Sequence, residues 1–411
     1  MSTGDLLLGA RSLAVSAPGA PGPVDRPSIH GRAGTECLHD ATIAVGKSRV
    51  DAIAHIDAPL RHWLTSRLQE VEDGLATAVS SPVALADRTG HHLLAAGGKR
   101  FRPLVTLLVG ASVSPTPPER LLDAAMACEL LHLSTLYHDD VIDAASTRRG
   151  VPSVNATWGE RLAVLAGDRL TALAFASAAA AGSETPGVLA GTYRRLVEGE
   201  RHETLLLGRL DGGVAAYLDV VDGKTASLLA AAAHVGAAVA DATSVRRQAA
   251  EAWGRTLGVA FQLADDLLDL TATADDTGKP VGNDLRLGVY TWPVLDAVEG
   301  HAGRHLRRVL AAPPPHPADV VEEAIDIVRT SGALERAEAT VDRLLARADD
   351  HLAVLPDGGA RHGLRELARS LVPSGTASAA VPSGAGASDT RSSGVVASGT
   401  VPVPEAATVA V

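Results

Sequence analysis

Two matched runs of aspartate, each closing an apolar segment, constrain this chain more than any other feature. The first run closes segment 131–138 and the second closes segment 261–264. On a helix, which turns by about 100° per residue, the first and last aspartates of each run fall on one face, one turn apart. The sequence therefore predicts two helices tipped with carboxylates: Asp139, Asp140 and Asp143 in the first cluster, and Asp265, Asp266 and Asp269 in the second.

Carboxylates so close together repel one another, and beside an apolar wall they need a cation. Mg²⁺ is held in this way, by a few carboxylates together with phosphate oxygens. If the two helices face each other, their carboxylates can hold magnesium ions from opposite sides and leave room for a diphosphate. The alternative, a solvated end on each helix, suits a single acidic run better than two matched runs. The clusters therefore predict Mg²⁺ and a diphosphate substrate.

Composition narrows the class of protein. Ala, Leu and Val dominate the middle of the chain and aromatic residues make up 3% of it, which favours close-packed helices over sheets. The net charge of −11 argues against a nucleic-acid partner. Cys37 and Cys128 have no disulfide or metal-ligand spacing, which fits a reducing, cytoplasmic location. The longest apolar stretches, 170–181 and 228–240, are shorter than the roughly 20 residues of a membrane span, so no transmembrane segment is expected.

The chain divides into three parts by its residue pattern. Residues 1–48 and 373–411 are rich in small residues and proline and show no helical period, so we expect a disordered leader and a disordered tail. Between them, residues 49–372 carry apolar side chains at three- and four-residue steps. This period predicts one all-α domain.

A glycine turn with three cations precedes the first acidic helix, in segment 97–103. Its glycines let the backbone approach a phosphate, Lys99 supplies a compact charge, and Arg102 offers a planar fork for phosphate oxygens. The alternative is an exposed basic loop. The position of the turn upstream of the acidic cluster favours a phosphate site.

Further polar groups flank the first cluster. His132 lies seven residues before Asp139, almost two helical turns, and therefore on nearly the same face, where it can donate to a phosphate. The alternative for His132 is a satisfied core side chain. Arg148 and Arg149 follow the cluster and can bind one diphosphate each, or form an ordinary charged helix end.

Two later segments add cations. Gly223 interrupts a helical pattern and places Lys224 and Thr225 at a kink, where they can meet a developing positive charge or a diphosphate, unless the kink serves packing alone. Lys279 lies in segment 276–285, which is typical of a lid loop. Both segments therefore join the candidate site.

Taken in order, these motifs resemble those of the all-trans polyprenyl diphosphate synthases. The resemblance covers roughly residues 50–372 and rests on Gly-Gly-Lys-Arg-Phe-Arg-Pro, Asp-Asp-Val-Ile-Asp with Arg-Arg-Gly, Lys-Thr, Phe-Gln-Leu-Ala-Asp-Asp-Leu-Leu-Asp and Gly-Lys-Pro-Val-Gly-Asn-Asp-Leu. It implies an isoprenoid synthase helical bundle around a deep central cavity, usually a homodimer, with residues 49–372 as the catalytic domain. The implied reaction is a Mg²⁺-dependent prenyl transfer that condenses isopentenyl diphosphate with an allylic diphosphate to an all-trans polyprenyl diphosphate.

The resemblance also implies a role for each matching residue. The isopentenyl diphosphate site comprises Lys99, Arg102, His132 and Arg149. The allylic diphosphate site comprises Arg148, Lys224, Thr225, Gln262 and Lys279. The metal ligands are Asp139, Asp143 and Asp265, with Asp140 and Asp269 ligating directly or through water, and Asp266 belongs to the same catalytic motif.

One position departs from the family pattern. The family usually carries Gly-Lys-x-Thr after the lid, where this chain reads Gly288-Val289-Tyr290-Thr291. Because Val289 cannot contact phosphate, allylic binding loses one contact unless Arg286 replaces it.

Product length is expected to depend on the residues below the first cluster. Ser134 and Thr135 lie about one turn before Asp139, and Leu131 lies about one turn further down. In the resembling enzymes a bulky aromatic residue there stops the product short. Since Ser134 and Thr135 are small, we expect a product of geranylgeranyl length or longer.

Two other functions are compatible with parts of this pattern. A class I terpene cyclase also ionises an allylic diphosphate, but it needs no isopentenyl site, and the basic residues of that site argue against it. A non-catalytic partner subunit would be expected to lose its aspartates, whereas this chain keeps both clusters.

Overall fold

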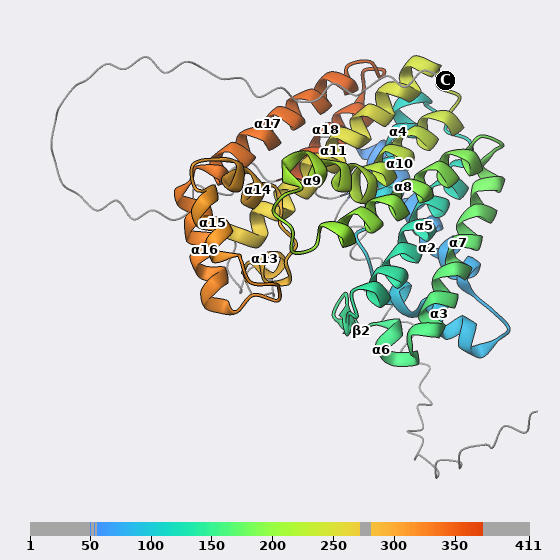
Figure 1. Cartoon of the computed structure of the whole chain (residues 1–411). Helices are drawn as coiled ribbons and strands as arrows, with labels where there is room; N and C mark the ends of the chain where they lie inside the picture. Colours follow the sequence, from blue (N-terminus) through green and yellow to red (C-terminus); the bar gives the residue numbers. More distant parts are fainter. Residues whose placement is uncertain (1–49, 51–52, 54–55, 272–280, 373–411) are drawn as a thin grey trace, which may run out of the picture.

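The computed structural model describes residues 50, 53, 56–271 and 281–372, and these form a bundle of α-helices (Figure 1). The all-α class predicted from the sequence is confirmed. The predicted leader and tail, residues 1–48 and 373–411, and the segment that contains Lys279 lie outside the described residues.

The first half of the bundle runs from α2 to α8, and a small hairpin, β1–β2, follows α5. In chain order its elements are α2 (Ala58–Val79), α3 (Ala84–Ala95), α4 (Phe101–Val113), α5 (Leu121–Ile142), β1 (Thr147–Arg148), β2 (Val151–Pro152), α6 (Val154–Trp158), α7 (Glu160–Ala181) and α8 (Thr185–Leu206).

The second half contains the longest described helix and a π-helical turn. In chain order its elements are α9 (Gly213–Val221), η1 (Asp222–Ala226), α10 (Ser227–Val239), α11 (Ser244–Thr271), α13 (Asn283–Leu287), α14 (Trp292–Glu299), α15 (Gly303–Val309), α16 (Ala318–Thr330), α17 (Ala333–Leu352) and α18 (Gly359–Leu371). Helix α17 packs along α11, and the short helices α13–α16 gather at one end (Figure 1).

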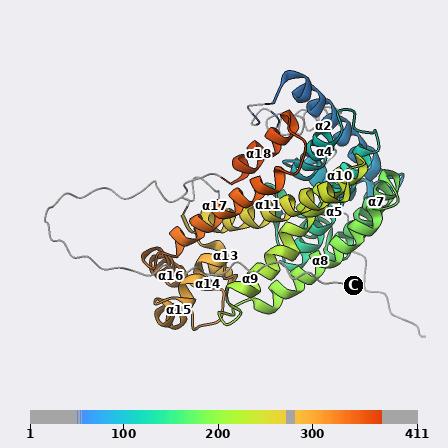
Figure 2. The ribbon, with the colours of Figure 1, turned by 90° about the horizontal axis from the view of Figure 1, so that it is seen from above.

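The core is built around α5 and α10. Helix α5 packs against α4, α7 and α10, while α10 is buried along almost its whole length because its side chains are small. A Cβ added at Gly236 would lie 2.5 Å from the Thr106 carbonyl oxygen, and one at Gly254 would lie 2.5 Å from that of Leu229. These glycines let α10 approach α4 and α11 closely, and Figure 2 shows α10 and α11 running side by side.

The chain after the first acidic cluster differs from an ordinary helix end. Helix α5 stops at Ile142, and the two arginines lie in and beside the antiparallel pair β1–β2, whose register pairs Arg148 with Val151. Arg149 and Gly150 at the turn have positive φ angles, 54° and 78°. The hairpin, which local sequence propensity does not reveal, returns both arginine side chains toward the bundle.

The apolar stretch in α7 is longer than the sequence analysis gives it. Helix α7 is a single helix of 22 residues, long and apolar enough by length and composition to cross a membrane, although 33% of its most apolar window is buried inside the bundle. Helix α7 packs extensively against α5. The apolar stretch is longer than expected because the helix starts at Glu160, before the range 170–181 that the sequence singles out.

Candidate active site

The first acidic cluster places two carboxylates at the end of α5. Asp139 lies in the last turn, and Asp143 caps the helix with its backbone N–H, which donates to the Asp139 carbonyl oxygen at 2.8 Å. Burial raises the pKa of Asp139 to about 7; Glu200 and Asp143 add to this increase, whereas Lys224 opposes it. Burial likewise raises the pKa of Asp143. The two carboxylates are therefore crowded by other acids and favour an added cation.

Asp140 is directed differently from its neighbours. Its side chain is fully buried, and Arg148 donates to its Oδ1 from Nε and from a terminal nitrogen, both at 2.7 Å. The Asn155 side-chain amide donates to the Asp140 carbonyl oxygen at 3.0 Å. The Asp140–Arg148 pair thus connects the hairpin to α5. Asp140, a predicted metal ligand, and Arg148, a predicted diphosphate ligand, therefore bind each other in this structure.

Lys224 lies near Asp139 and is paired with two glutamates that the sequence analysis did not include in the site. Its ammonium forms an ion pair with Glu200 at 2.7 Å and a closer one with Glu203, both from α8. These carboxylates raise the pKa of Lys224 although burial opposes the increase. Glu200 and Glu203 lie about one turn apart on their helix. This spacing alone gives no sign that they face a site rather than solvent.

The π-helical turn η1 sets the direction of Lys224. Gly199 of α8 and Gly223 of η1 touch, and a Cβ added at Gly199 would lie 2.7 Å from the Lys224 backbone nitrogen. A π-helical turn holds one extra residue and frequently occurs at functional sites. The predicted interruption at Gly223 is therefore a widened turn, pressed against α8, rather than a break in the helix.

Thr225, the next residue, points toward the second acidic helix. Its hydroxyl donates to the side-chain oxygen of Gln262 at 2.9 Å, and the Gln262 amide donates to Asp266 Oδ1 at 3.1 Å. The Tyr217 hydroxyl donates to the other Asp266 oxygen. Burial raises the pKa of Asp266 to about 8, against the effect of these two hydrogen bonds. Asp266 therefore belongs to the interior network.

The other two acids of the second cluster are more accessible. Asp265 is exposed, and Asp269 accepts hydrogen bonds at 3.2 Å from the backbone N–H groups of Asn283 and Asp284, which open α13. The turn η1 thus lies between the two acidic helices, with Lys224 toward the first and Thr225 toward the second. Within the described residues, no group of three or more His, Cys, Asp or Glu side chains is already arranged to hold a metal ion.

The residues of the predicted isopentenyl site include a separate group of cationic side chains around His132. Burial lowers the pKa of His132 well below its usual value, and the nearby Arg102 and Arg149 add to the decrease. Arg102 Nε is buried and has no hydrogen-bond partner among the residues that the structure describes, whereas Arg149 donates to the Leu93 carbonyl oxygen at 3.0 Å and to that of Gly97. Lys99 is exposed. A neutral His132 and an unsatisfied guanidinium nitrogen suit an anion at this place.

Arg100, between Lys99 and Arg102, has a role that the sequence does not reveal. Its φ angle is +44°, and its buried side chain pairs with Glu72 of α2 and, at 3.2 Å, with Glu129 of α5. Buried charges persist only when they are paired and hydrogen-bonded. This triad fixes the glycine turn between two helices and so positions its two neighbouring cations.

The residues predicted to set product length separate into two environments. Thr135 lines a cavity of about 320 Å³ beside Asp139 and Lys224, whose apolar wall includes Tyr193 and Leu196 of α8. Ser134, in contrast, is fully buried, and its hydroxyl donates to the carbonyl oxygen of the equally buried Leu131 at 2.7 Å. Of the three, only Thr135 is part of this cavity.

The segment around the family departure is well packed. Gly288 ends α13 with a φ angle of +82°, and the Val289 N–H donates to the Asp284 carbonyl oxygen at 2.9 Å. The exposed Arg286 donates to the Asn283 side chain at 3.1 Å. Arg286 therefore has a local partner in this structure.

The fold and the site together define an all-α bundle that carries acidic and cationic side chains at its predicted site residues. Comparison with known proteins makes the class specific. Residues 83–328 match the sequence model of the polyprenyl synthetase family, and the chain belongs to that family. It is accordingly a prenyltransferase of the polyprenyl diphosphate synthase class, as its motifs predict.

Individual relatives agree over most of their length. The chain is 41% identical to a nonaprenyl diphosphate synthase of Mycobacterium tuberculosis, over 80% of this chain and 96% of the relative. It is 38% identical to component 2 of a heptaprenyl diphosphate synthase of Geobacillus stearothermophilus, over 74% and 95%. A Caulobacter crescentus polyprenyl synthase, solved with calcium and isoprenyl diphosphate, superposes with a TM-score of 0.71 at 31% identity, over 79% and 97%. The isoprenoid synthase fold is confirmed.

Proposed function

We propose that this enzyme uses Mg²⁺ to condense isopentenyl diphosphate with an allylic diphosphate and makes an all-trans product of geranylgeranyl length or longer. The observation that carries the proposal is the division of the site. The carboxylates Asp139 and Asp143 have Glu200 and Lys224 as charged neighbours, whereas the charges that act most strongly on His132 are those of Arg102 and Arg149. Two anionic substrates can therefore bind separately.

The first acidic cluster fits a divalent cation. Asp139 has Asp143 and Glu200 as acidic neighbours, and this crowding contributes to its raised pKa. Hard oxygen donors of this kind are those that Mg²⁺ prefers. Asp139 and Asp143 would hold the ion from α5, with Asp265 contributing from α11; when bound, Mg²⁺ neutralises charge on a departing diphosphate. The Caulobacter crescentus polyprenyl synthase was solved with calcium and isoprenyl diphosphate, which supports a divalent cation beside a diphosphate in this fold.

The chain's own residues perform the remaining tasks. Arg102, Arg149 and neutral His132 hold the isopentenyl diphosphate by charge and hydrogen bonds. Lys224 exchanges its glutamate partners for the allylic diphosphate, whose C–O bond breaks to leave an allylic cation. The terminal alkene carbon of isopentenyl diphosphate then forms the new C–C bond, and a proton leaves to the released diphosphate. The Thr225 and Gln262 dipoles face the positive charge while it exists.

The cavity beside Thr135 is the proposed path of the growing chain. Thr135 of α5 and Leu196 and Tyr193 of α8 line this cavity together with Asp139. Apolar walls also exclude water, which would otherwise capture the cation. The small Thr135 leaves the entrance open, which supports a product of geranylgeranyl length or longer.

A second copy of this chain is the proposed partner of the α7 surface. Leu165 on α7 is 62% exposed, and the neighbouring Val164 is 40% exposed, so α7 carries apolar side chains that a second copy could cover. Light scattering should show a dimer, and Leu165→Glu should shift it toward the monomer. A wild-type monomer, or recruitment to phosphatidylcholine vesicles instead of self-association, would contradict the dimer.

One incubation tests the reaction. The purified full chain is given isopentenyl diphosphate with dimethylallyl, geranyl or farnesyl diphosphate in turn, with and without Mg²⁺, and the products are sized. We expect products of twenty carbons or more, formed only with Mg²⁺. Conversion of an allylic diphosphate without isopentenyl diphosphate would indicate a terpene cyclase. Absence of turnover would contradict the proposed reaction and favour a non-catalytic subunit.

A further inference from the structure

The inner face of α11 touches η1 at three points, two of which involve groups outside the reaction described above. Arg255, Gly258 and Gln262 follow one another at steps of three and four residues, so they share a face of the helix. A Cβ added at Gly258 would lie 2.5 Å from the Ala226 Cα atom, which shows how closely this face approaches the turn. Gln262 bonds to Thr225 at the downstream end of the turn.

Arg255 holds the other end. One of its terminal nitrogens donates to both carboxylate oxygens of Asp222, the first residue of η1, at 2.6 and 2.8 Å. Arg195 of α8 approaches the same carboxylate at 3.5 Å. The arginine and aspartate side chains are 27% and 34% exposed, so solvent only partly screens their attraction. Asp222 is therefore fixed chiefly from α11.

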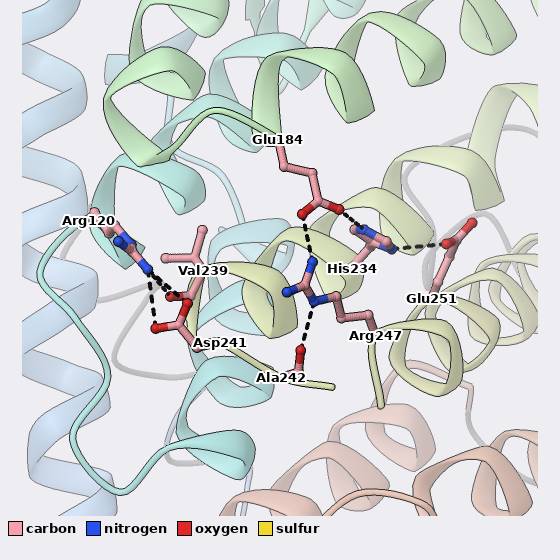
Figure 3. Close-up of polar contacts among 8 residues, drawn as sticks. All are labelled: Arg120, Glu184, His234, Val239, Asp241, Ala242, Arg247 and Glu251. Carbon is pink, nitrogen blue, oxygen red and sulfur yellow. Dashed lines mark hydrogen bonds and ion pairs between the residues drawn. The ribbon is translucent and has the colours of Figure 1, made fainter. Parts of the chain in front are cut away.

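Arg255 is itself oriented by a chain of charged groups. Its other terminal nitrogen lies 3.4 Å from Glu251, whose second oxygen is 3.0 Å from His234 Nδ1. His234 Nε2 lies 3.3 Å from Glu184, at the start of α8, and Arg247 donates to Glu184 at 2.6 Å. Figure 3 shows His234 between the two glutamates, with Arg247 beside Glu184. This chain limits the positions that the guanidinium can adopt.

We propose that Arg255 is a positioning residue for the reaction: by clamping Asp222 it fixes the start of η1, while Gln262 fixes Thr225, and the two attachments together direct Lys224. A π-helical turn has one residue more than the α-helix on either side, and its ends must be held if the extra residue is to stay in place. Loss of the upstream attachment allows the turn to relax toward α-helical geometry, which rotates Lys224 and Thr225 away from their present partners.

The test uses the full chain and a matched pair of variants. Arg255→Gln removes the clamp, and Arg365→Gln removes a similar ion pair between α18 and α17, where Arg365 and Asp349 are 3.0 Å apart and 28% and 31% exposed. Thermal unfolding, kcat, and the KM for each substrate are measured, together with amide hydrogen exchange of residues 222–226. Arg255→Lys keeps the positive charge and tests whether a cation without the guanidinium group restores turnover.

We expect both glutamine variants to lower the unfolding temperature, because each removes a partly exposed arginine–aspartate ion pair. Only Arg255→Gln should reduce kcat, by about tenfold or more, raise the KM for the allylic diphosphate and speed exchange in 222–226. Asp222→Asn should do the same, the double variant should be no worse than either single one, and Arg255→Lys should recover part of the loss.

Two results would overturn the proposal: kcat and KM of Arg255→Gln within twofold of the wild type, or equal losses in the Arg365→Gln control. The inference rests on the proposed function for its kinetic readout. If the wild-type protein shows no turnover, the proposed function fails, and amide exchange decides on the clamp: unchanged exchange in 222–226 of Arg255→Gln overturns it.

Discussion

The hydroxyl of Thr225 donates a 2.9 Å hydrogen bond to Gln262, and this bond joins the π-helical turn to the second acidic helix. Thr225→Val keeps the shape of the side chain and removes the donor. Stability should fall by about 1 kcal/mol, and turnover by roughly tenfold or more, because a dipole that faces the cation is lost. Steady-state kinetics and urea unfolding measure the two effects, and unchanged turnover would rule out a role for this hydroxyl.

Carboxylates that differ in accessibility should differ in function. Asp139→Asn and Asp265→Asn are each expected to lower turnover on the order of a thousandfold, since the proposed Mg²⁺ ligands lose their charge. Asp266→Asn changes a buried group that accepts from Tyr217 and Gln262 and should chiefly reduce the unfolding temperature. Turnover at saturating Mg²⁺ distinguishes them; near-wild-type activity of Asp139→Asn would remove the metal assignment.

Product length should respond to Thr135 and not to its neighbour. Thr135→Phe places a ring in the cavity beside Asp139 and should shorten the product, as measured by chromatography of the dephosphorylated alcohols. Ser134→Phe inserts the same ring where the side chain is fully buried, and overpacking should cost about 1–3 kcal/mol of stability. The cavity is not the path of the chain if Thr135→Phe leaves the product distribution unchanged.

The pair of Asp140 and Arg148 should be structural. Arg148→Gln leaves a fully buried carboxylate without its cation, so we expect a loss of about 2–3 kcal/mol in the free energy of unfolding. Asp140→Asn with Arg148→Gln should recover part of this loss, because no buried charge then remains unpaired. Chemical denaturation of the single and double variants gives the coupling, and an additive result would mean that the two side chains act independently.

The His234 cluster predicts a specific dependence of stability on pH. Its hydrogen bond to Glu251 raises the pKa of His234 above its usual 6.5, and the same bond lowers the pKa of Glu251 below 4.5. The stabilisation is therefore complete between about pH 4.5 and 6.5. It is lost as pH rises through the raised histidine pKa, and also as pH falls through the lowered glutamate pKa.

The test compares the free energy of unfolding of the wild type with that of His234→Gln at each pH, from below pH 4.5 to well above pH 6.5. The difference between them should be largest near pH 5.5 and should shrink as the pH rises through the raised pKa of His234. His62→Gln, at an exposed position on α2, serves as the control. A difference that is constant with pH would show that packing, and not charge, explains any effect at His234.

The sequence predicts most of the helices because apolar period is a local property. The helices that approach each acidic run follow from it, whereas the cations near Gly98 are identified from a glycine turn. The partners of Arg100 do not, because Glu72 and Glu129 are distant in the sequence and spacing does not reveal which helix face meets another. The π-helical turn is predicted only as an irregularity at Gly223.

The same limit explains the missed glutamates. Glu200 and Glu203 lie on a helix with many charged residues, and only the contact between Gly199 and η1 shows that they face Lys224. The division of the aspartates into accessible and interior members also depends on tertiary contacts, since Asp265 and Asp266 are adjacent in sequence. The predicted Mg²⁺ ligands, the homodimer, the cytoplasmic location and the two terminal segments stay predictions.

The contact between Gly199 and Gly223 leaves almost no freedom to redesign this part of the enzyme. Even an alanine methyl at Gly199 would meet the Lys224 backbone at 2.7 Å, so it must push α8 and η1 apart. Libraries made to alter the product can vary the cavity wall around Tyr193, where space is available, but should keep both glycines. The close approach of α8 to η1 at these two glycines therefore sets how far the Lys224 side chain extends toward Asp139.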